Sequence, residues 1–149
     1  GAWVADHQWA AVVGLAAVVV PVFLATVFHG ANIGYIHRSQ MSEAISLMGM
    51  ARTPIAEYYA NNGKWPGDLK KIVESTSGKY TDRIVITSGA GAASGVFTIT
   101  ATMEASGVHS AGAGKTAQMS SEDGGKTWTC RRGAINGVDD KYLPAACRQ

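Results

Sequence analysis

The stretch WAAVVGLAAVVVPVFLATVF, residues Trp9 to Phe28, decides the fold of this chain. Its twenty residues are all apolar or small. Because an α-helix rises about 1.5 Å per residue, a helix of this length spans about 30 Å, the thickness of the hydrocarbon core of a bilayer. A signal peptide would begin with basic residues and have a shorter apolar core. We therefore expect a single membrane-spanning helix.

The charged residues divide the 149-residue chain into two parts. There is no Asp, Glu, Lys or Arg between Asp6 and Arg38. Apart from Asp6, every charged residue lies from Arg38 onward. We expect a hydrophobic helix at residues 1–37 and a polar globular domain at residues 38–149. The formal net charge of +2 is too small to indicate nucleic-acid binding by itself.

Proline and glycine residues lie at informative places in the apolar part. Pro21 lacks a backbone N–H, so we expect it to kink or loosen the helix locally. Gly14 leaves a flat patch, and Gly30 and Gly34 have the small-xxx-small spacing that favours close approach of another helix. Glycine is also common in membrane helices in general, so these glycines are equally well explained without any role in helix packing.

The helical pattern continues beyond the apolar stretch. Apolar residues recur at helical spacing at Met41, Ala44, Ile45, Met48, Ala51 and Ile55. The sequence NNG at residues 61–63, followed by KWP, predicts the end of the helix. Pro54 predicts a second kink. We expect one element of about fifty residues, apolar in its first half and amphipathic in its second.

Three stretches later in the chain have the β-branched and aromatic residues that are typical of strands. They are RIVITSG (83–89), GVFTITATME (95–104) and TAQMSSEDGGKTWTC (116–130). Residues 122–127 contain paired glycines that favour a hairpin turn. Residues 67–82 are expected to form a helical turn or a loop. A small antiparallel sheet with one apolar face would cover the amphipathic half of the helix, which predicts an α+β fold.

Two motifs resemble functional ones but lack the required context. AGAGKT (111–116) has His109 where the phosphate-binding pattern needs a glycine, and no helix is expected after it. SEDGGKTW (121–128) matches the Asp-box of sialidase propellers, where the motif repeats in every blade and is itself a structural hairpin. Asp139 and Asp140 are expected to lie in a loop.

The histidines offer no catalytic or metal-binding constellation either. They are scattered along the chain, at His7, His29, His37 and His109. No nucleophile, base or set of metal ligands converges in the sequence, so we expect no enzyme activity, no cofactor and no metal site.

The only two cysteines, Cys130 and Cys147, lie within the last twenty residues. An even pair beside a predicted membrane segment favours a disulfide in an oxidising compartment over two free thiols. In the chain-entropy model, closing a loop of this length stabilises the fold by about 3 kcal/mol. The bridge would also hold a C-terminal segment that has little core of its own.

The order of these features resembles a type IV pilin. Residues 38–66 resemble the exposed half of the long pilin helix and its exit. Residues 120–149, with their Trp-x-Cys and Leu-Pro-x-x-Cys ends, resemble the last strand and disulfide-bounded loop of the type IVa major pilins. The resemblance implies that the bridge pins the irregular C-terminal loop onto the last strand.

The start of the chain departs from that family. Pilins begin with a Phe-Thr-Leu-Ile-Glu-like stretch, whereas this chain begins GAWVADHQW, with Asp6 as its only acid there. Pro21 matches the helix-loosening proline of the family when counted from Gly1, but not when counted back from Arg38. Gly1 in place of Met indicates either processing or a longer product, and the sequence leaves both open.

The resemblance implies a structural subunit of an extracellular filament on a bacterial surface. Copies of the chain would pack their apolar helices, each held in the inner membrane before the pilus assembly machinery adds it. Adhesion, surface motility or DNA uptake would follow. The alternatives are a membrane-tethered minor pilin or pseudopilin, or a monomeric periplasmic binding domain, which the missing glutamate favours.

Two groups of residues are candidates for these roles. The assembly candidates are Gly1, whose amine in a neighbouring copy could pair with an acid, together with Asp6, Gly14, Pro21, Gly30 and Gly34. A basic cluster in or beside the disulfide loop is the candidate contact with a surface receptor or DNA, unless it is simply a solvated face: Arg131, Arg132, Lys141 and Arg148.

Overall fold

The computed structural model describes the backbone of residues 2–149 and the side chains of residues 17–26 and 34–149. The chain divides into two compact units, Gly1–Tyr35 and Ile36–Gln149. The second unit contains a four-stranded sheet and three short 3-10 helices.

The helix α1 runs from Ala2 to Asn62 without interruption. It is longer than the about fifty residues expected from the sequence, since it begins at Ala2. Pro21 and Pro54 both lie inside it, because a proline removes only its own backbone N–H and the flanking turns keep theirs. The helix ends where NNG predicted: the N–H of Gly63, at a φ of 66°, donates to the carbonyl of Tyr59.

In the part of the chain whose side chains the structure describes, no helix combines the length and the apolarity that a membrane crossing requires. The expected span from Trp9 to Phe28 extends into residues outside that part, and it stays a prediction.

The sheet is an antiparallel meander with its strands in chain order. The strands are β1 (Thr81–Ser88), β2 (Phe97–Met103), β3 (Thr116–Ser121) and β4 (Thr129–Arg132). The sequence predicted three strands, and the third of them is wrong as a single strand. Its residues form the two strands β3 and β4, and the hairpin turn predicted at residues 122–127, which joins them, is confirmed. The long helix and this sheet confirm the α+β fold.

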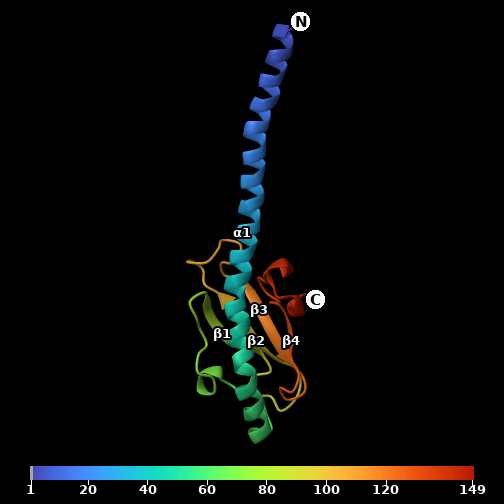
Figure 1. Ribbon diagram of the computed structural model, residues 1–149. Helices are drawn as coiled ribbons and strands as arrows, with labels where there is room; N and C mark the ends of the chain where they lie inside the picture. Colours follow the sequence, from blue (N-terminus) through green and yellow to red (C-terminus); the bar gives the residue numbers. More distant parts are fainter. Residues whose placement is uncertain (1) are drawn as a thin grey trace. The chain divides into compact units, whose positions relative to one another are not determined.

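The core lies between the amphipathic half of α1 and one face of the sheet (Figure 1). The helix contributes a buried stripe at the predicted spacing: Met41, Ala44, Met48, Ala51 and Ile55. Alternate residues of the strands face it, as the two-residue period of a strand requires: Ile84, Phe97, Ile99, Ala101, Met103, Ala117 and Met119. The sheet thus covers the apolar stripe, as the sequence predicted.

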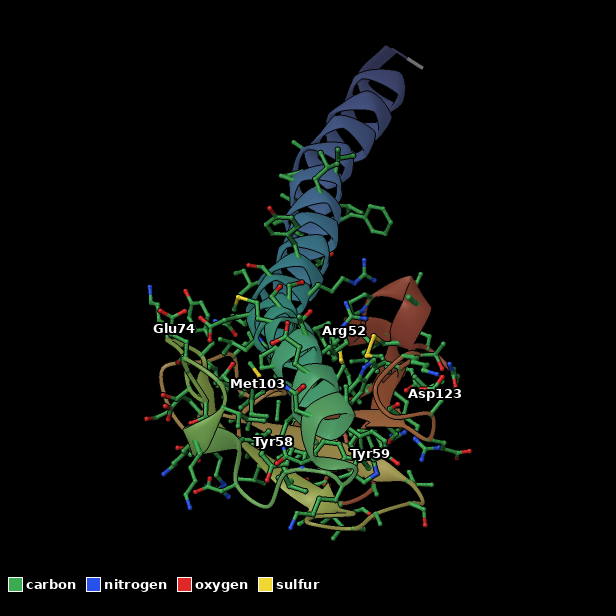
Figure 2. All side chains as sticks on the ribbon, turned by 90° about the horizontal axis from the view of Figure 1, so that it is seen from below. Arg52, Tyr58, Tyr59, Glu74, Met103 and Asp123 are labelled. Carbon is green, nitrogen blue, oxygen red and sulfur yellow. A yellow bond between two sulfur atoms is a disulfide. The ribbon has the colours of Figure 1, made fainter. Side chains whose placement is uncertain are left out.

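The exit of α1 is fixed by stacked aromatic rings. The ring of Trp65 lies parallel to that of Phe97, with centroids 4.6 Å apart. The ring of Tyr59 is tilted against the Trp65 ring, also with centroids 4.6 Å apart. The Tyr59 hydroxyl donates to the carbonyl of Ala93, and the indole N–H of Trp65 donates to that of Gly95. The loop before β2 is therefore tied to the end of the helix, where Figure 2 labels Tyr58 and Tyr59.

The turn between β3 and β4 packs closely on the helix. Gly124 and Gly125 both have positive φ, which a hairpin turn of this kind requires. A Cβ on Gly125 would lie 3.0 Å from the Cα of Ala56, so no larger residue fits between turn and helix.

Candidate functional site on the disulfide loop

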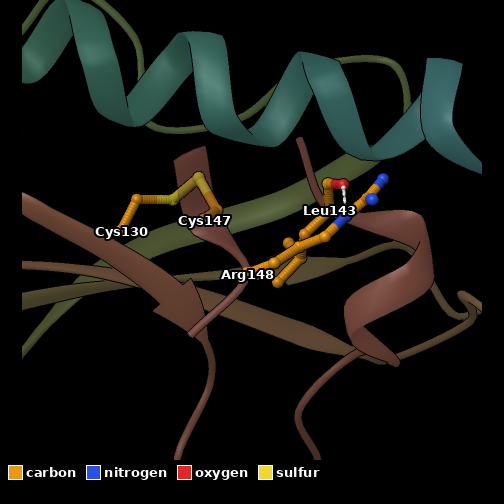
Figure 3. Close-up of a disulfide and its surroundings, with 4 residues drawn as sticks. All are labelled: Cys130, Leu143, Cys147 and Arg148. Carbon is orange, nitrogen blue, oxygen red and sulfur yellow. Dashed lines mark hydrogen bonds between the residues drawn. A yellow bond between two sulfur atoms is a disulfide. The ribbon is translucent and has the colours of Figure 1, made fainter. Parts of the chain in front are cut away.

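Cys130 on β4 and Cys147 on the 3-10 helix η3 (Ala145–Cys147) form a disulfide, as predicted (Figure 3). The loop that they close holds one further 3-10 helix, η2 (Asp140–Tyr142). Its buried apolar residues are few, namely Val138, Leu143 and Cys147 itself. The Nε of Arg148 donates to the carbonyl of Leu143 at 2.9 Å, which holds the chain end against the loop.

The first half of the loop is anchored to Thr116, the first residue of β3. The carbonyl of Thr116 accepts hydrogen bonds from the N–H groups of Gly133 and Val138, at 2.9 and 3.0 Å. Its N–H donates to the carbonyl of Asn136, and its hydroxyl donates to that of Ile135. A side chain on Gly133 would collide with Thr116. This half of the loop is therefore held in one conformation.

Asn136, at the tip of the loop, has a positive φ of 53° and a side chain that makes two hydrogen bonds. Its amide nitrogen donates to the carbonyl of Gly114, and its amide oxygen accepts from the Nζ of Lys115 at 3.0 Å. The neighbouring Ile135 is 85% exposed. The tip thus presents an apolar side chain on a rigid backbone.

Three cationic side chains lie around a cleft of about 690 Å³ beside this tip. Lys115 comes from the segment before β3, and Arg131 and Arg132 come from the end of β4. The buried amide of Gln118 lines the cleft, and its oxygen accepts from the N–H of Ala134. Among the residues whose side chains the structure describes, no carboxylate lines this cleft, so it suits an anionic group.

Three of the four basic residues that the sequence grouped lie around two neighbouring cavities: Arg132 lines both, Arg131 lines the cleft, and Lys141 lines the smaller one. Only Arg131 and Arg132 line the cleft. Lys141 pairs with Asp139, 3.3 Å away, and this neighbour raises the pKa of the Lys141 ammonium. Arg148 lies by Leu143. Lys115 is the third cation of the cleft, and it was not predicted from the sequence. The antiparallel pairing of β3 with β4 could have predicted that the residue before β3 lies near the end of β4.

The assembly candidates fall mostly outside the described residues. Of Gly1 nothing is described, and of Asp6, Gly14 and Gly30 only the helical backbone. Pro21 is exposed, and a Cβ on Gly34 would meet no atom within 4 Å. Around Pro21, six large apolar side chains are between 49% and 68% exposed: Val18, Val19, Val20, Val22, Phe23 and Leu24.

The remaining sequence motifs serve the fold. Asp123, in the Asp-box-like turn, accepts hydrogen bonds from the hydroxyl of Ser121 and from both the N–H and the hydroxyl of Thr127. In AGAGKT, Thr116 begins a strand where a phosphate-binding loop would begin a helix. Asp139 caps η2 by accepting from the N–H of Lys141. Within the described residues, no three His, Cys, Asp or Glu side chains are grouped to hold a metal ion.

Comparison with known proteins shows which family this chain belongs to. Residues 37–148, which include the sheet, the disulfide and the cleft, match the pilins, a family of bacterial filament proteins. The chain belongs to the pilin family. This confirms the resemblance to type IV pilins, and the family is one of structural proteins.

Three relatives give the extent of the similarity. The pilin is 40% identical over 118 residues to the fimbrial protein EcpC of Eikenella corrodens, covering 76% of this chain and 72% of that one. It is 30% identical to a fimbrial protein of Neisseria meningitidis serogroup A and to the type IV major pilin protein PilE1 of Neisseria gonorrhoeae. Each of these two alignments covers 93% of this chain and 86% of the relative.

Proposed function

We propose that this pilin is the repeating subunit of a type IV pilus-like filament on a bacterial surface, polymerising through its N-terminal hydrophobic helix. The observation that supports this most is the exposed apolar run from Val18 to Leu24. Burying a large apolar side chain is worth about 1.5 to 3 kcal/mol relative to leaving it exposed. Such a run therefore favours lipid around it before assembly and other copies of itself afterwards.

The same helix would serve both states in turn. Before assembly it would hold the subunit in the inner membrane, from which the pilus assembly machinery would take it. In the filament, Gly14, Gly30 and Gly34 would let neighbouring helices approach closely. Asp6 would need a cationic partner in such an apolar core, and the amine of Gly1 in a neighbouring copy is our candidate.

The cationic cleft would be the contact surface of the assembled filament. Lys115, Arg131 and Arg132 are arranged around it beside a loop that is anchored to Thr116, so an anionic group could bind without reordering the backbone. Adhesion to an anionic surface receptor and uptake of DNA both fit this chemistry. Surface motility would follow from the filament itself.

The first test is electron microscopy of material sheared from cells that express the protein, with intact-mass analysis of the same fraction. Thin filaments built from this chain, two hydrogens lighter for the Cys130–Cys147 bridge, are the expected result. Phe23→Asp places a charge in the exposed apolar run and should abolish the filaments. Ile135→Asp is the control, because it charges an even more exposed apolar residue on the disulfide loop and should leave the filaments intact.

Three outcomes would contradict the proposal. Abundant membrane-bound protein without filaments would favour the tethered minor pilin, the pseudopilin or the monomeric binding domain. Filaments that survive Phe23→Asp, or that are lost equally in both variants, would remove the apolar run from its proposed role in assembly.

A further inference from the structure

His37 on α1 is a buried histidine for which filament assembly gives no reason. It is 2% exposed, and the segments around it come from three parts of the unit Ile36–Gln149. Its ring is stacked on that of Tyr142, with centroids 4.0 Å apart, and meets the edge of the His109 ring at 4.7 Å. A Cβ on Gly112 would lie 2.7 Å from its Cε1, so the site is closely packed on that side as well.

The segments around His37 are also joined to the helix by direct hydrogen bonds. The Nε of Arg38 donates to the carbonyl of Lys141, at 3.0 Å. The N–H of His109 donates to the side-chain oxygen of Gln40, at 2.9 Å. The turn at residues 109–112 and the helix η2 therefore both close over the same turn of α1.

The charges that face this site are mainly positive. His109 from the turn and Lys141 from η2 act on the His37 ring, and Arg38 from α1 lies beside them through its bond to the carbonyl of Lys141. A neighbouring cavity of about 350 Å³ is lined by Tyr142 and by four charged residues, namely Lys115, Arg132, Asp139 and Lys141. Two carboxylates lie on the same turn as η2: Asp139 pairs with Lys141, and Asp140 has one buried oxygen without a hydrogen-bond partner among the described residues.

The neutral form of His37 suits this environment, and the charged form does not. Burial, followed by the charges of His109 and Lys141, lowers the pKa of the His37 imidazole below its usual 6.5. Its Nε2 has no hydrogen-bond acceptor among the described residues. A proton on that ring would therefore be both desolvated and repelled.

We propose that His37 is an acid-sensitive lock that holds η2 and the 109–112 turn closed on α1 while it is neutral and releases them when it takes up a proton. Releasing them returns the ring to water, where its pKa is the ordinary 6.5. The open state thus binds more protons, so the closed state has its full stability above pH 6.5 and loses stability as the pH falls below it.

The disulfide limits how far the opening extends. Because Cys147 stays bonded to Cys130 on β4 and the N–H of Val138 stays bonded to Thr116, the opening covers the segment between Val138 and Cys147 and the 109–112 turn. The sheet and the anchoring of the loop tip at Thr116 involve neither His37 nor η2. The lock is therefore local, and it does not depend on whether the chain forms a filament.

Hydrogen exchange of the full-length, disulfide-bonded chain tests this lock, read by mass spectrometry at pH 7.5 and 5.0 and corrected for the intrinsic exchange rate. Protection of residues 138–146 should fall relative to β2, by up to about tenfold for each unit by which the pKa of His37 is lowered. His37→Phe keeps an aromatic ring against Tyr142 without a titrating group, and its protection should not change with pH. His109→Gln removes one repelling neighbour, so its fall should be smaller.

An equal fall in His37→Phe and in the unmodified chain would overturn the proposal, as would an unmodified chain with no fall. Should His37→Phe fail to fold, NMR titration of the His37 ring in the unmodified chain decides. A pKa below 6.5 supports the lock, and a pKa of 6.5 or above overturns it.

Discussion

At the scale of single residues, Asp123 shows how an exposed carboxylate can define a turn. Three hydrogen bonds from Ser121 and Thr127 converge on it, and the Ser121 hydroxyl in turn accepts from the N–H of Gly125. The bonds from Thr127 are the main reason why the pKa of Asp123 falls from 3.8 to about 2. The charged form is thus the one that the turn stabilises.

This pKa predicts a pH dependence with a defined sign. Since the folded-state pKa lies below the unfolded one, Asp123 stabilises the fold fully above about pH 4, and the contribution is lost as the pH falls towards 2. Asp123→Ala should therefore lower the melting temperature by much more at pH 7 than at pH 2. Glu122→Ala, which removes the exposed carboxylate next to it, is the control and should have little effect at either pH. Equal losses in the two variants at pH 7 would show that charge alone, and not these bonds, matters.

His37 marks the limit of prediction from the sequence at this scale. It lies four residues before Met41, so the periodicity that identified the helical stripe extends to it. That spacing could have placed it on the buried face. Its contacts with His109 and Tyr142 join segments about seventy and a hundred residues away, and no local pattern encodes them.

At the scale of elements, the disulfide loop is the part with the least core. The strand β4 has no buried residue, and the 3-10 helices η2 and η3 bury only Cys147 between them. Most of the hydrogen bonds that hold the loop go to Thr116 or its neighbours. A loop of this kind gains little from apolar burial, so the covalent bridge is its main restraint on the unfolded chain.

Replacing both cysteines by alanine should therefore lower the free energy of unfolding by about 3 kcal/mol. Urea unfolding of the full chain measures this, with the unmodified chain reduced by dithiothreitol as the control. The reduced chain and the double variant should unfold at the same urea concentration, well below that of the oxidised chain. A double variant as stable as the oxidised chain would mean that packing of Val138 and Leu143 suffices to hold the loop.

Elements with a regular period could be predicted from the sequence, and their docking could not. The buried stripe of α1 and the strands β1 and β2 follow from hydrophobic spacing and β-branched residues. The third predicted strand hid a hairpin, although its paired glycines marked the turn. The attachment of the loop to Thr116 rests on backbone groups and one hydroxyl, which carry no periodic signal.

At the scale of the whole molecule, the net charge of +2 conceals an uneven distribution. Lys115, Arg131 and Arg132 surround one cleft that no carboxylate of the described residues lines, while other cations, such as Lys141, are paired. Attraction to a polyanion would then depend on where the charge lies and not on how much there is. In a filament each subunit would present the same cleft, and such repetition raises the strength of binding to a long anionic partner.

Removing two of these charges should weaken binding to double-stranded DNA and to heparin. The affinity for each immobilised ligand is measured at salt concentrations between about 50 and 200 mM. For the Arg131→Ala, Arg132→Ala variant, the slope of log affinity against log salt for DNA should be reduced by about 2, because each lost phosphate contact contributes about 0.9. Arg52→Ala with Lys70→Ala changes the net charge by the same amount through exposed residues outside the cleft, and it should bind like the unmodified chain. If the two variants lose binding equally, the overall charge is responsible and the cleft is not a site. If only the cleft variant loses binding, the ligand that it loses most strongly identifies whether the surface favours nucleic acid or an anionic glycan.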